Sequence, residues 1–343
     1  MRAAFALLTA CIALSLVSLP AIAKLKLNSA EESLGWIKGY REQPKPDAVP
    51  DLVRELARVG AFQEPEAAGV YVGFIAGVIG ANPTRAEKLI AEMSGIPDAD
   101  QWVVVKAIAY SRLGNWRHLM ALASADLPSR GTMIDAYLTG KLPGFDRYRL
   151  EEDTPSMLER AGQLVGLGEE EQEAFLEPSP TILDTLWGYY FATGSTKPLM
   201  DIADLVGWSA DGNDVARLTI GSSAKYSLAA NASRDAILLD AVKEVRTTIT
   251  DEDLAPLVDE AIFAAEISET GKLRDEAAES IAILREKGPA YLRKVAWWGR
   301  AGEGAIALGC VTAAVTGQVY LGIPCVIGGA VTSAVLRYLA TES

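Results

Sequence analysis

Residues 107–123 read AIAYSRLGNWRHLMALA and residues 187–203 read WGYYFATGSTKPLMDIA, so two similar stretches lie 80 residues apart in the chain. They align without gaps and share a central glycine, Gly114 or Gly194, which is followed by an Asn or a Ser. Glycine suits the left-handed residue that ends a helix, and Asn or Ser can cap the next helix. The other shared residues are Tyr110/Tyr190, Leu119/Leu199, Met120/Met200 and Ala123/Ala203. Each stretch is therefore predicted to form two helices joined by a short turn.

Helical patterns also fill most of the chain around these two stretches. No segment shows the alternation of apolar and polar residues that is typical of strands. Residues 64–79 are apolar on nearly all sides, which predicts a buried helix that is too short to span a membrane. The further predicted helices span 29–40, 49–59, 83–93, 129–139, 154–164, 169–175, 215–230, 233–245, 251–267 and 272–287, and residues 141–153 are predicted to form a loop. We expect an all-α fold of paired antiparallel helices.

The two helix pairs resemble the tetratricopeptide-like class of helical repeats at Tyr110, Gly114 and Ala123 and at their counterparts in the second stretch. The resemblance implies stacked helix pairs that form a protein-binding superhelix. The repeat period of about 34 residues that defines this class is not visible here. The sequence leaves two arrangements open, a solenoid-like array and an irregular bundle.

The first 23 residues have the pattern of a cleaved secretory signal peptide. Arg2 precedes an apolar run over residues 3–19, and Pro20 is followed by the small-residue site Ala-Ile-Ala at residues 21–23. A lipoprotein-type cleavage before Cys11 is the alternative, but it would leave an apolar run on the mature chain. We expect an exported, periplasmic protein with a signal peptide (1–23), a helical domain (24–290) and a hydrophobic C-terminal hairpin (291–343).

The charge of the chain limits the classes of partner. Its formal net charge is −13 over 343 residues. A balance this acidic argues against a general nucleic-acid binder, because phosphates repel it. The partners that remain are another protein, membrane lipid at the C-terminus, or a second copy of the chain.

Residues 304–336 carry no charge and are predicted to form a helical hairpin. Small residues recur there every four positions, which lets two helices approach closely. The positions that carry this pattern are Ala301, Ala305, Gly309, Ala313 and Gly317 in the first limb, and Cys325, Gly329 and Ser333 in the second. Each limb of about 15 residues is about 22 Å long, which is shorter than the roughly 30 Å of membrane hydrocarbon.

Aromatic and basic residues flank this segment, among them Trp297 and Trp298, as in an interfacial belt on a lipid surface. Three interpretations stay open: a hairpin buried in the protein or in an oligomer, a re-entrant or membrane-surface hairpin, and one tilted span. The hairpin is similar to that of pore-forming colicin domains, which implies membrane activity. A disulfide between Cys310 and Cys325 requires a turn between them, since one helix would hold them about 22 Å apart.

Catalytic motifs are sparse. His118 is the only histidine, and it follows an arginine at the start of a predicted helix, where an exposed or packing role is expected. Ser222 and Lys225 fit the S-x-x-K pattern of penicillin-recognising serine enzymes, in which the lysine activates the serine, but the companion S-D-N and K-T-G motifs are absent. We therefore expect no enzyme, no metal site and no cofactor, and the serine acyl enzyme is kept as an alternative.

Four aromatic residues of the paired helices, Trp102, Tyr110, Trp187 and Tyr190, are the candidates for a binding groove. Tyrosine and tryptophan are favoured contact residues, and stacked helices present a concave face. The hypothesis is thus an exported helical protein-interaction or scaffolding module of the bacterial envelope, which the C-terminus associates with a membrane or a partner. The alternative from another class is a membrane-active protein that inserts the hydrophobic hairpin.

Overall fold

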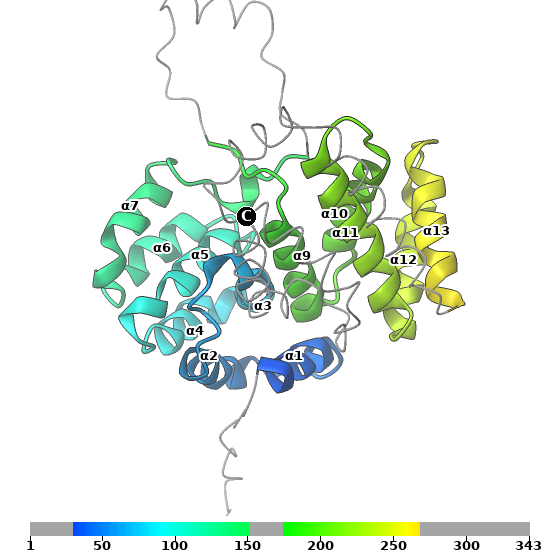
Figure 1. Ribbon diagram of the computed structural model, residues 1–343. Coiled ribbons are helices and arrows are strands. Elements are labelled where there is room, and N and C mark those ends of the chain that lie inside the picture. The colour runs from blue at the N-terminus through cyan, green and yellow to red at the C-terminus, as the bar shows by residue number, and fades with distance from the viewer. Residues whose placement is uncertain (1–29, 151–173, 268–343) are drawn as a thin grey trace, which may run out of the picture.

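The computed structural model describes residues 30–150 and 174–267 (Figure 1). Within these two ranges the chain forms twelve α-helices and no β-strand, which confirms the all-α prediction. The helices are α1 (Ala30–Gly39), α2 (Val49–Arg58), α3 (Gly69–Ala81), α4 (Ala86–Met93), α5 (Trp102–Tyr110), α6 (Trp116–Ala123), α7 (Gly131–Leu138), α9 (Pro180–Thr193), α10 (Thr196–Val206), α11 (Val215–Ala232), α12 (Ala236–Thr248) and α13 (Leu254–Glu266).

Several predictions fall on residues outside the described ranges. These are the signal peptide, the helix at 154–164, most of the short helix at 169–175, the helix at 272–287, the domain boundary at 290 and the C-terminal hairpin. The hairpin prediction includes Trp297, Trp298, Gly309, Gly317 and Gly329, and the cysteine pair Cys310 and Cys325.

Some helices start at a residue whose side chain caps the first turn. The side chain of Ser179 accepts a hydrogen bond from the amide of Ile182 in the first turn of α9, at 3.2 Å. Asp214 does the same for two amides at the start of α11, at 2.8 and 3.1 Å. Because caps of this kind act within a few residues, the starts of these helices were accessible from the sequence.

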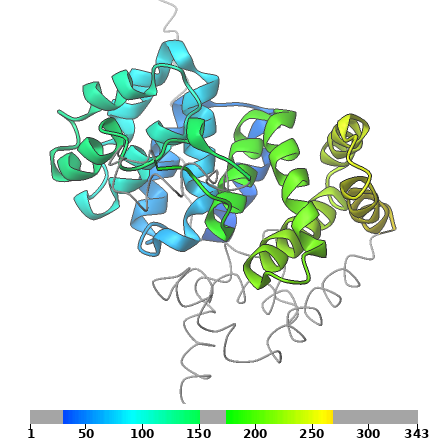
Figure 2. The ribbon, with the colours of Figure 1, turned by 90° about the horizontal axis from the view of Figure 1, so that it is seen from above.

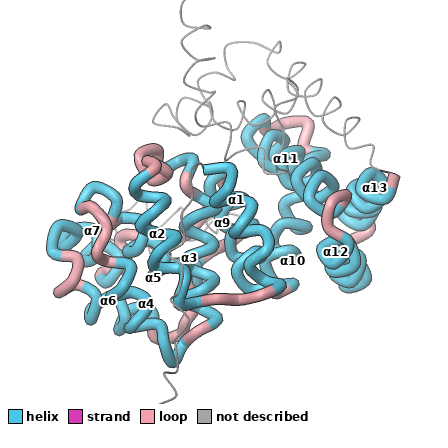
Figure 3. Tube along the Cα trace, turned by 90° about the horizontal axis from the view of Figure 1, so that it is seen from below, coloured by secondary structure: helices cyan, strands magenta, loops and turns pink. Residues whose placement is uncertain are grey.

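The pairing of α3 with α9 forms the centre of the fold (Figures 1 and 3). A Cβ atom added to Gly73 of α3 would lie 1.9 Å from the carbonyl oxygen of Thr185, and one added to Gly188 of α9 would lie 2.0 Å from that of Val70. Gly69 and Gly77 extend the same face of α3, so the two backbones approach closely along the whole contact. Small residues four apart allow such an approach because they present one smooth helix face.

Most of the other helices lie on the two sides of this pair, and α1 packs against α9 and α2. Helices α2 and α4–α7 lie on one side, and α10–α13 on the other, with α12 and α13 at the far edge (Figures 1 and 2). One hydrophobic core runs through both sides, from Leu34 to Ala265. The α3–α9 contact joins helices about 100 residues apart, whereas solenoid repeats contact only their sequence neighbours, so this contact favours the irregular bundle.

The two similar stretches differ in their turns. In the second, Gly194 has φ +65°, and the hydroxyl of Ser195 accepts a hydrogen bond from the amide of Lys197 in the first turn of α10, as predicted. In the first, the prediction is wrong: Arg112 takes the left-handed conformation (φ +59°) instead of Gly114, and the side chain of Asn115 makes no capping hydrogen bond. The first turn is longer, with five residues between its helices, and its left-handed residue is the second of these five.

Candidate functional site

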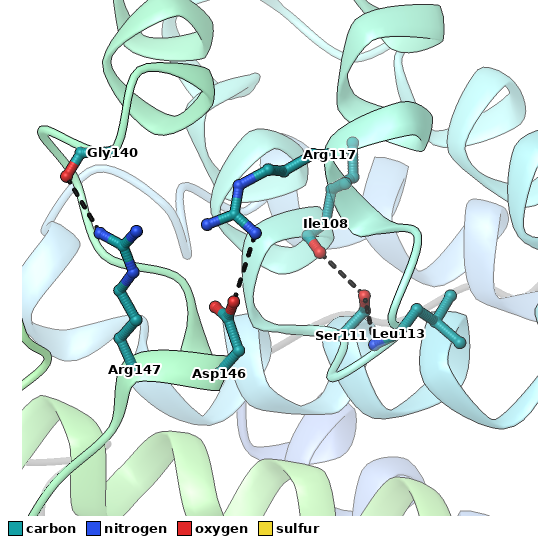
Figure 4. Close-up of polar contacts among 7 residues, drawn as sticks. All are labelled: Ile108, Ser111, Leu113, Arg117, Gly140, Asp146 and Arg147. Atoms are coloured by element: carbon teal, nitrogen blue, oxygen red, sulfur yellow. Dashed lines mark hydrogen bonds and ion pairs between the residues drawn. The ribbon is translucent and has the colours of Figure 1, made fainter.

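A turn under backbone strain connects the two helices of the first stretch, α5 and α6. Between α5 and α6, the hydroxyl of Ser111 donates to the carbonyl oxygen of Ile108 at 2.8 Å and accepts from the amide of Leu113 at 3.4 Å (Figure 4). These bonds hold the turn around Arg112, whose left-handed conformation is costly for a residue with a Cβ. A conformation of this kind persists only where the surrounding contacts hold it.

Those contacts come from the side chain of Arg112. Its guanidinium pairs with Asp201 of α10 at 2.5 Å, and both side chains are largely buried, with 16% and 15% of their areas exposed. The same guanidinium lies 4.5 Å from the ring centre of Phe145 and 5.3 Å from that of Tyr189. Arg112 thus holds the α5–α6 turn against α10 with a desolvated ion pair and two cation–π contacts.

The loop at residues 140–150 is fixed beside this turn. Asp146 lies 3.4 Å from the guanidinium of Arg117, and Arg147 points back to donate to the carbonyl oxygen of Gly140 at 3.4 Å (Figure 4). Further along, the backbones of Arg147 and Arg149 each form a hydrogen bond to Leu176 at 3.1 Å. These bonds position the end of the loop, Leu150, next to α10.

Leu150 forms one wall of a groove with a volume of about 410 Å³. The groove lies between α10, the 3-10 turn at Gly207–Ala210, the last turn of α12 and the first turn of α13. Its apolar lining includes Leu150, Met200, Trp208, Val245, Ile249 and Leu254. Met200 is 42% exposed, whereas its counterpart in the first stretch, Met120, is fully buried. The groove therefore exposes an apolar side chain at a position where the corresponding side chain of the first stretch is buried.

The polar lining of the groove is acidic. Asp204 and Asp251 contribute carboxylates, and no lysine or arginine lines the groove among the described residues. Burial and the nearby charge of Asp201 raise the pKa of Asp204, and Lys197 acts in the opposite direction. The pKa of Asp251 is lowered because its carboxylate accepts hydrogen bonds from the amides of Leu254 and Asp253, at 3.0 and 2.8 Å. Asp251 thus caps the start of α13, and the groove combines apolar surface with negative charge.

The groove predicted from the aromatic residues is wrong for three of its four members. Tyr110, Trp187 and Tyr190 have at most 3% of their areas exposed and belong to the core. The indole of Trp187 donates to the hydroxyl of Ser227 at 3.0 Å. Trp102 is half-buried and donates to the carbonyl oxygen of Phe62 at 3.3 Å. Large aromatic side chains bury much apolar area, and these four pack in or against the core. They therefore line no common surface.

The candidate catalytic residues lie apart from the groove. Ser222 is 7% exposed within α11, and the ammonium of Lys225 forms an ion pair with Glu260 of α13. The ammonium of Lys225 is therefore paired with a carboxylate of another helix. His118 is exposed near the start of α6.

The part of the chain that the structure describes contains neither a membrane-spanning helix nor a cluster of metal ligands. In residues 30–150 and 174–267, no helix is both long enough and apolar enough to cross a bilayer. In the same ranges, no group of three or more histidine, cysteine or carboxylate side chains is arranged to hold a metal ion.

Sequence reasoning missed the groove because nothing in the pattern of Met200, Asp204 and Trp208 distinguishes them from an ordinary amphipathic helix and its end. Comparisons with protein-family models, with curated proteins and with solved structures found no match.

Proposed function

We propose that this chain is an exported protein-interaction module of the bacterial envelope, and that it binds a short segment of a partner protein in the groove between α10, α12 and α13. The observation that carries the proposal is the combination of exposed apolar surface at Met200 with the carboxylates of Asp204 and Asp251. Export rests on the signal-like first 23 residues and remains part of the proposal.

The chemistry of the groove selects the kind of segment. A volume of about 410 Å³ accommodates one or two apolar side chains, and apolar anchors in such clefts dominate binding energy. The carboxylates at its wall and at the start of α13 favour lysine or arginine beside the anchor, because opposite charges steer association and fix orientation. The proposed ligand is thus an extended or helical segment with an apolar residue flanked by basic ones.

The first experiment is selection of peptides on the full chain from a random-sequence display library. Selected peptides are then synthesised, and their dissociation constants are measured by fluorescence anisotropy. We expect basic residues around a leucine or phenylalanine. We also expect the double variant Asp204→Asn, Asp251→Asn to bind about tenfold more weakly, because each lost charge contact contributes roughly 0.7 kcal/mol. Asparagine at residue 251 retains the capping oxygen, so the start of α13 is kept.

Two matched controls separate the groove from the rest of the surface. Met200→Ala removes an apolar side chain from the groove wall, and Leu122→Ala removes one of nearly the same exposure (43% against 42%) from α6. Asp126→Asn removes an exposed carboxylate after α6. Only the groove variants are expected to weaken binding. Selection of no peptide, or equal binding by wild type and all groove variants, would disprove the proposed function.

A further inference from the structure

The last described helix, α13, begins at the groove and ends away from it. Leu254, its first residue, lines the groove, and Ile267, the last described residue, follows its other end. A helix of 13 residues is about 20 Å long. The chain therefore leaves the described ranges about one helix length from the groove, roughly 20 Å along α13 (Figure 1).

The residues that follow Ile267 are numerous enough to return to the groove. The sequence predicts a helix over residues 272–287, which lie outside the described ranges. A helix of that length is about 24 Å long, so if it runs antiparallel to α13 it ends level with Leu254. Without any helix, residues 268–286 span up to roughly 65 Å when extended. The chain after residue 287 is therefore within reach of the groove.

Residues 287–300, KGPAYLRKVAWWGR, have the composition that the groove favours. They include four basic residues and no acidic one, although the whole chain has a net charge of −13. Arg293 and Lys294 directly follow Leu292, and two tryptophans come soon after. An apolar residue with basic neighbours is the type of segment that the proposed function assigns to the groove.

The groove complements this segment in charge, and packing holds its shape. The carboxyl-bearing residues Asp204 and Asp251 are exposed, and no lysine or arginine lines the groove among the described residues. The guanidinium of Arg217 lies 4.8 Å from the ring centre of Trp208, and a Cβ added to Gly221 would lie 2.4 Å from the carbonyl carbon of Trp208. Helix α11 thus fixes this wall from behind, and a fixed wall needs little rearrangement to bind.

We propose that residues 287–300 of the same chain occupy the groove, and that a partner segment binds by displacing them. The proposal rests on the proposed function, since it gives the groove the same kind of ligand. The covalent connection keeps the segment at an effective concentration of roughly millimolar order, so a weak contact is enough to fill the groove. Partner segments then bind with an apparent affinity that is reduced by the occupied fraction.

Photo-cross-linking of the full chain tests the proposal. The photoreactive residue p-benzoylphenylalanine replaces Met200 at the groove or, as the control, Leu122 of α6, which has nearly the same exposure (42% and 43%). Cleavage at glutamate then releases residues 287–303 as one peptide, because Glu286 and Glu303 bound it. We expect the probe at residue 200 to cross-link this peptide within the monomer, and the probe at residue 122 to leave it unmodified. No such cross-link, or one only between two chains, would overturn the proposal.

Charge reversal tests the contacts that hold the segment. Arg293→Glu with Lys294→Glu replaces two attractions by repulsions and is expected to lower the yield of the cross-link about fivefold. The matched control, Lys272→Glu with Arg274→Glu, reverses two cations outside the segment and is expected to keep the yield. Addition of Asp204→Arg to the first variant is expected to restore part of the yield, which a misfolded variant would not show. Equal yields in wild type and both double variants would overturn the proposal.

A peptide from the display selection separates this proposal from the proposed function. In the variant Arg293→Glu, Lys294→Glu its dissociation constant is expected to fall about fivefold, because the groove is less often occupied. Peptide binding without the cross-link would overturn the occupancy by residues 287–300 and leave the proposed function intact. The cross-link without peptide binding to wild type or variant would support the occupancy and disprove the proposed partner binding.

Discussion

The carbonyl oxygen of Thr185 in α9 lies 1.9 Å from the position that a Cβ atom would take on Gly73 of α3. No side chain fits at Gly73 unless the two backbones separate. Since α3 and α9 form the centre of the fold, the spacing at this one contact determines how both sides of the molecule pack.

Gly73→Ala is therefore expected to lower the free energy of unfolding by about 3 kcal/mol, because an added methyl group forces the α3–α9 backbones apart. Gly35→Ala is the control: Gly35 lies in α1, and an added Cβ there would meet no atom within 4 Å. This control is expected to stabilise the protein by about 1 kcal/mol through helix propensity. Urea denaturation followed by circular dichroism measures both. Equal effects of the two variants would contradict the close backbone contact.

The turn of the second helix pair needs its glycine, Gly194, whereas the turn of the first pair does not need Gly114. Gly194→Ala places a Cβ at φ +65° and is expected to destabilise the protein by about 1 kcal/mol. Gly114→Ala is expected to change stability by less than about 0.5 kcal/mol, because Gly114 is not in the left-handed region and its added Cβ would meet nothing within 4 Å. Thermal unfolding of the two variants tests this. A larger loss for Gly114→Ala would contradict the assignment of the first turn to Arg112.

The ion pair between Arg112 and Asp201 is expected to contribute to stability more than the exposed pair between Arg117 and Asp146. Asp201→Asn leaves a largely buried guanidinium without its charged partner and is expected to cost about 2 kcal/mol. Asp146→Asn removes a partner at 3.4 Å from a pair that is more than 40% exposed, and is expected to cost less than about 0.5 kcal/mol. Denaturant unfolding in low and high salt compares them. Equal losses would show that Arg112 does not depend on Asp201.

Burial lowers the pKa of Lys38, in the last turn of α1, to about 8, and this predicts a pH dependence of stability. The folded chain loses the Lys38 proton near pH 8 and the unfolded chain near 10.5, so the unfolded state binds more protons between these values. The free energy of unfolding of wild type therefore rises with pH in this window, relative to Lys38→Met, by about 2 kcal/mol. Below pH 8 the charged lysine is disfavoured in the fold, and Lys38→Met is expected to be the more stable protein. Urea denaturation of both proteins in phosphate-free buffer from pH 7 to pH 10 measures the difference. A pH-independent difference would contradict burial of the Lys38 ammonium.

Local chemistry made most helix positions predictable. Prolines, capping residues such as Ser179 and Asp214, and the apolar periodicity act within about one turn of chain, so the sequence contains all the information they need. Gly194 was assigned correctly for the same reason. The all-α class followed from these helices.

The site was not predictable in this way, because its parts come from distant segments. Leu150, Asp204 and Leu254 meet in one groove only after α10, α12 and α13 have packed. Nothing in the sequence places Met200 at the surface while its counterpart Met120 is fully buried. The three misassigned aromatic residues show the same limit, since residue type does not reveal whether a ring lies in the core or on a face.

By itself the sequence determined where the helices lie and at which residues many of them begin. It also determined that the chain is all-α and acidic. These properties depend on neighbouring residues and on composition. Only the tertiary structure decided that α3 pairs with α9, that Arg112 takes the left-handed position, and that the groove forms. Gly69, Gly73 and Gly77 show the difference: their spacing is visible in the sequence and indicates a smooth helix face, but the identity of the helix that packs on it depends on contacts over about 100 residues.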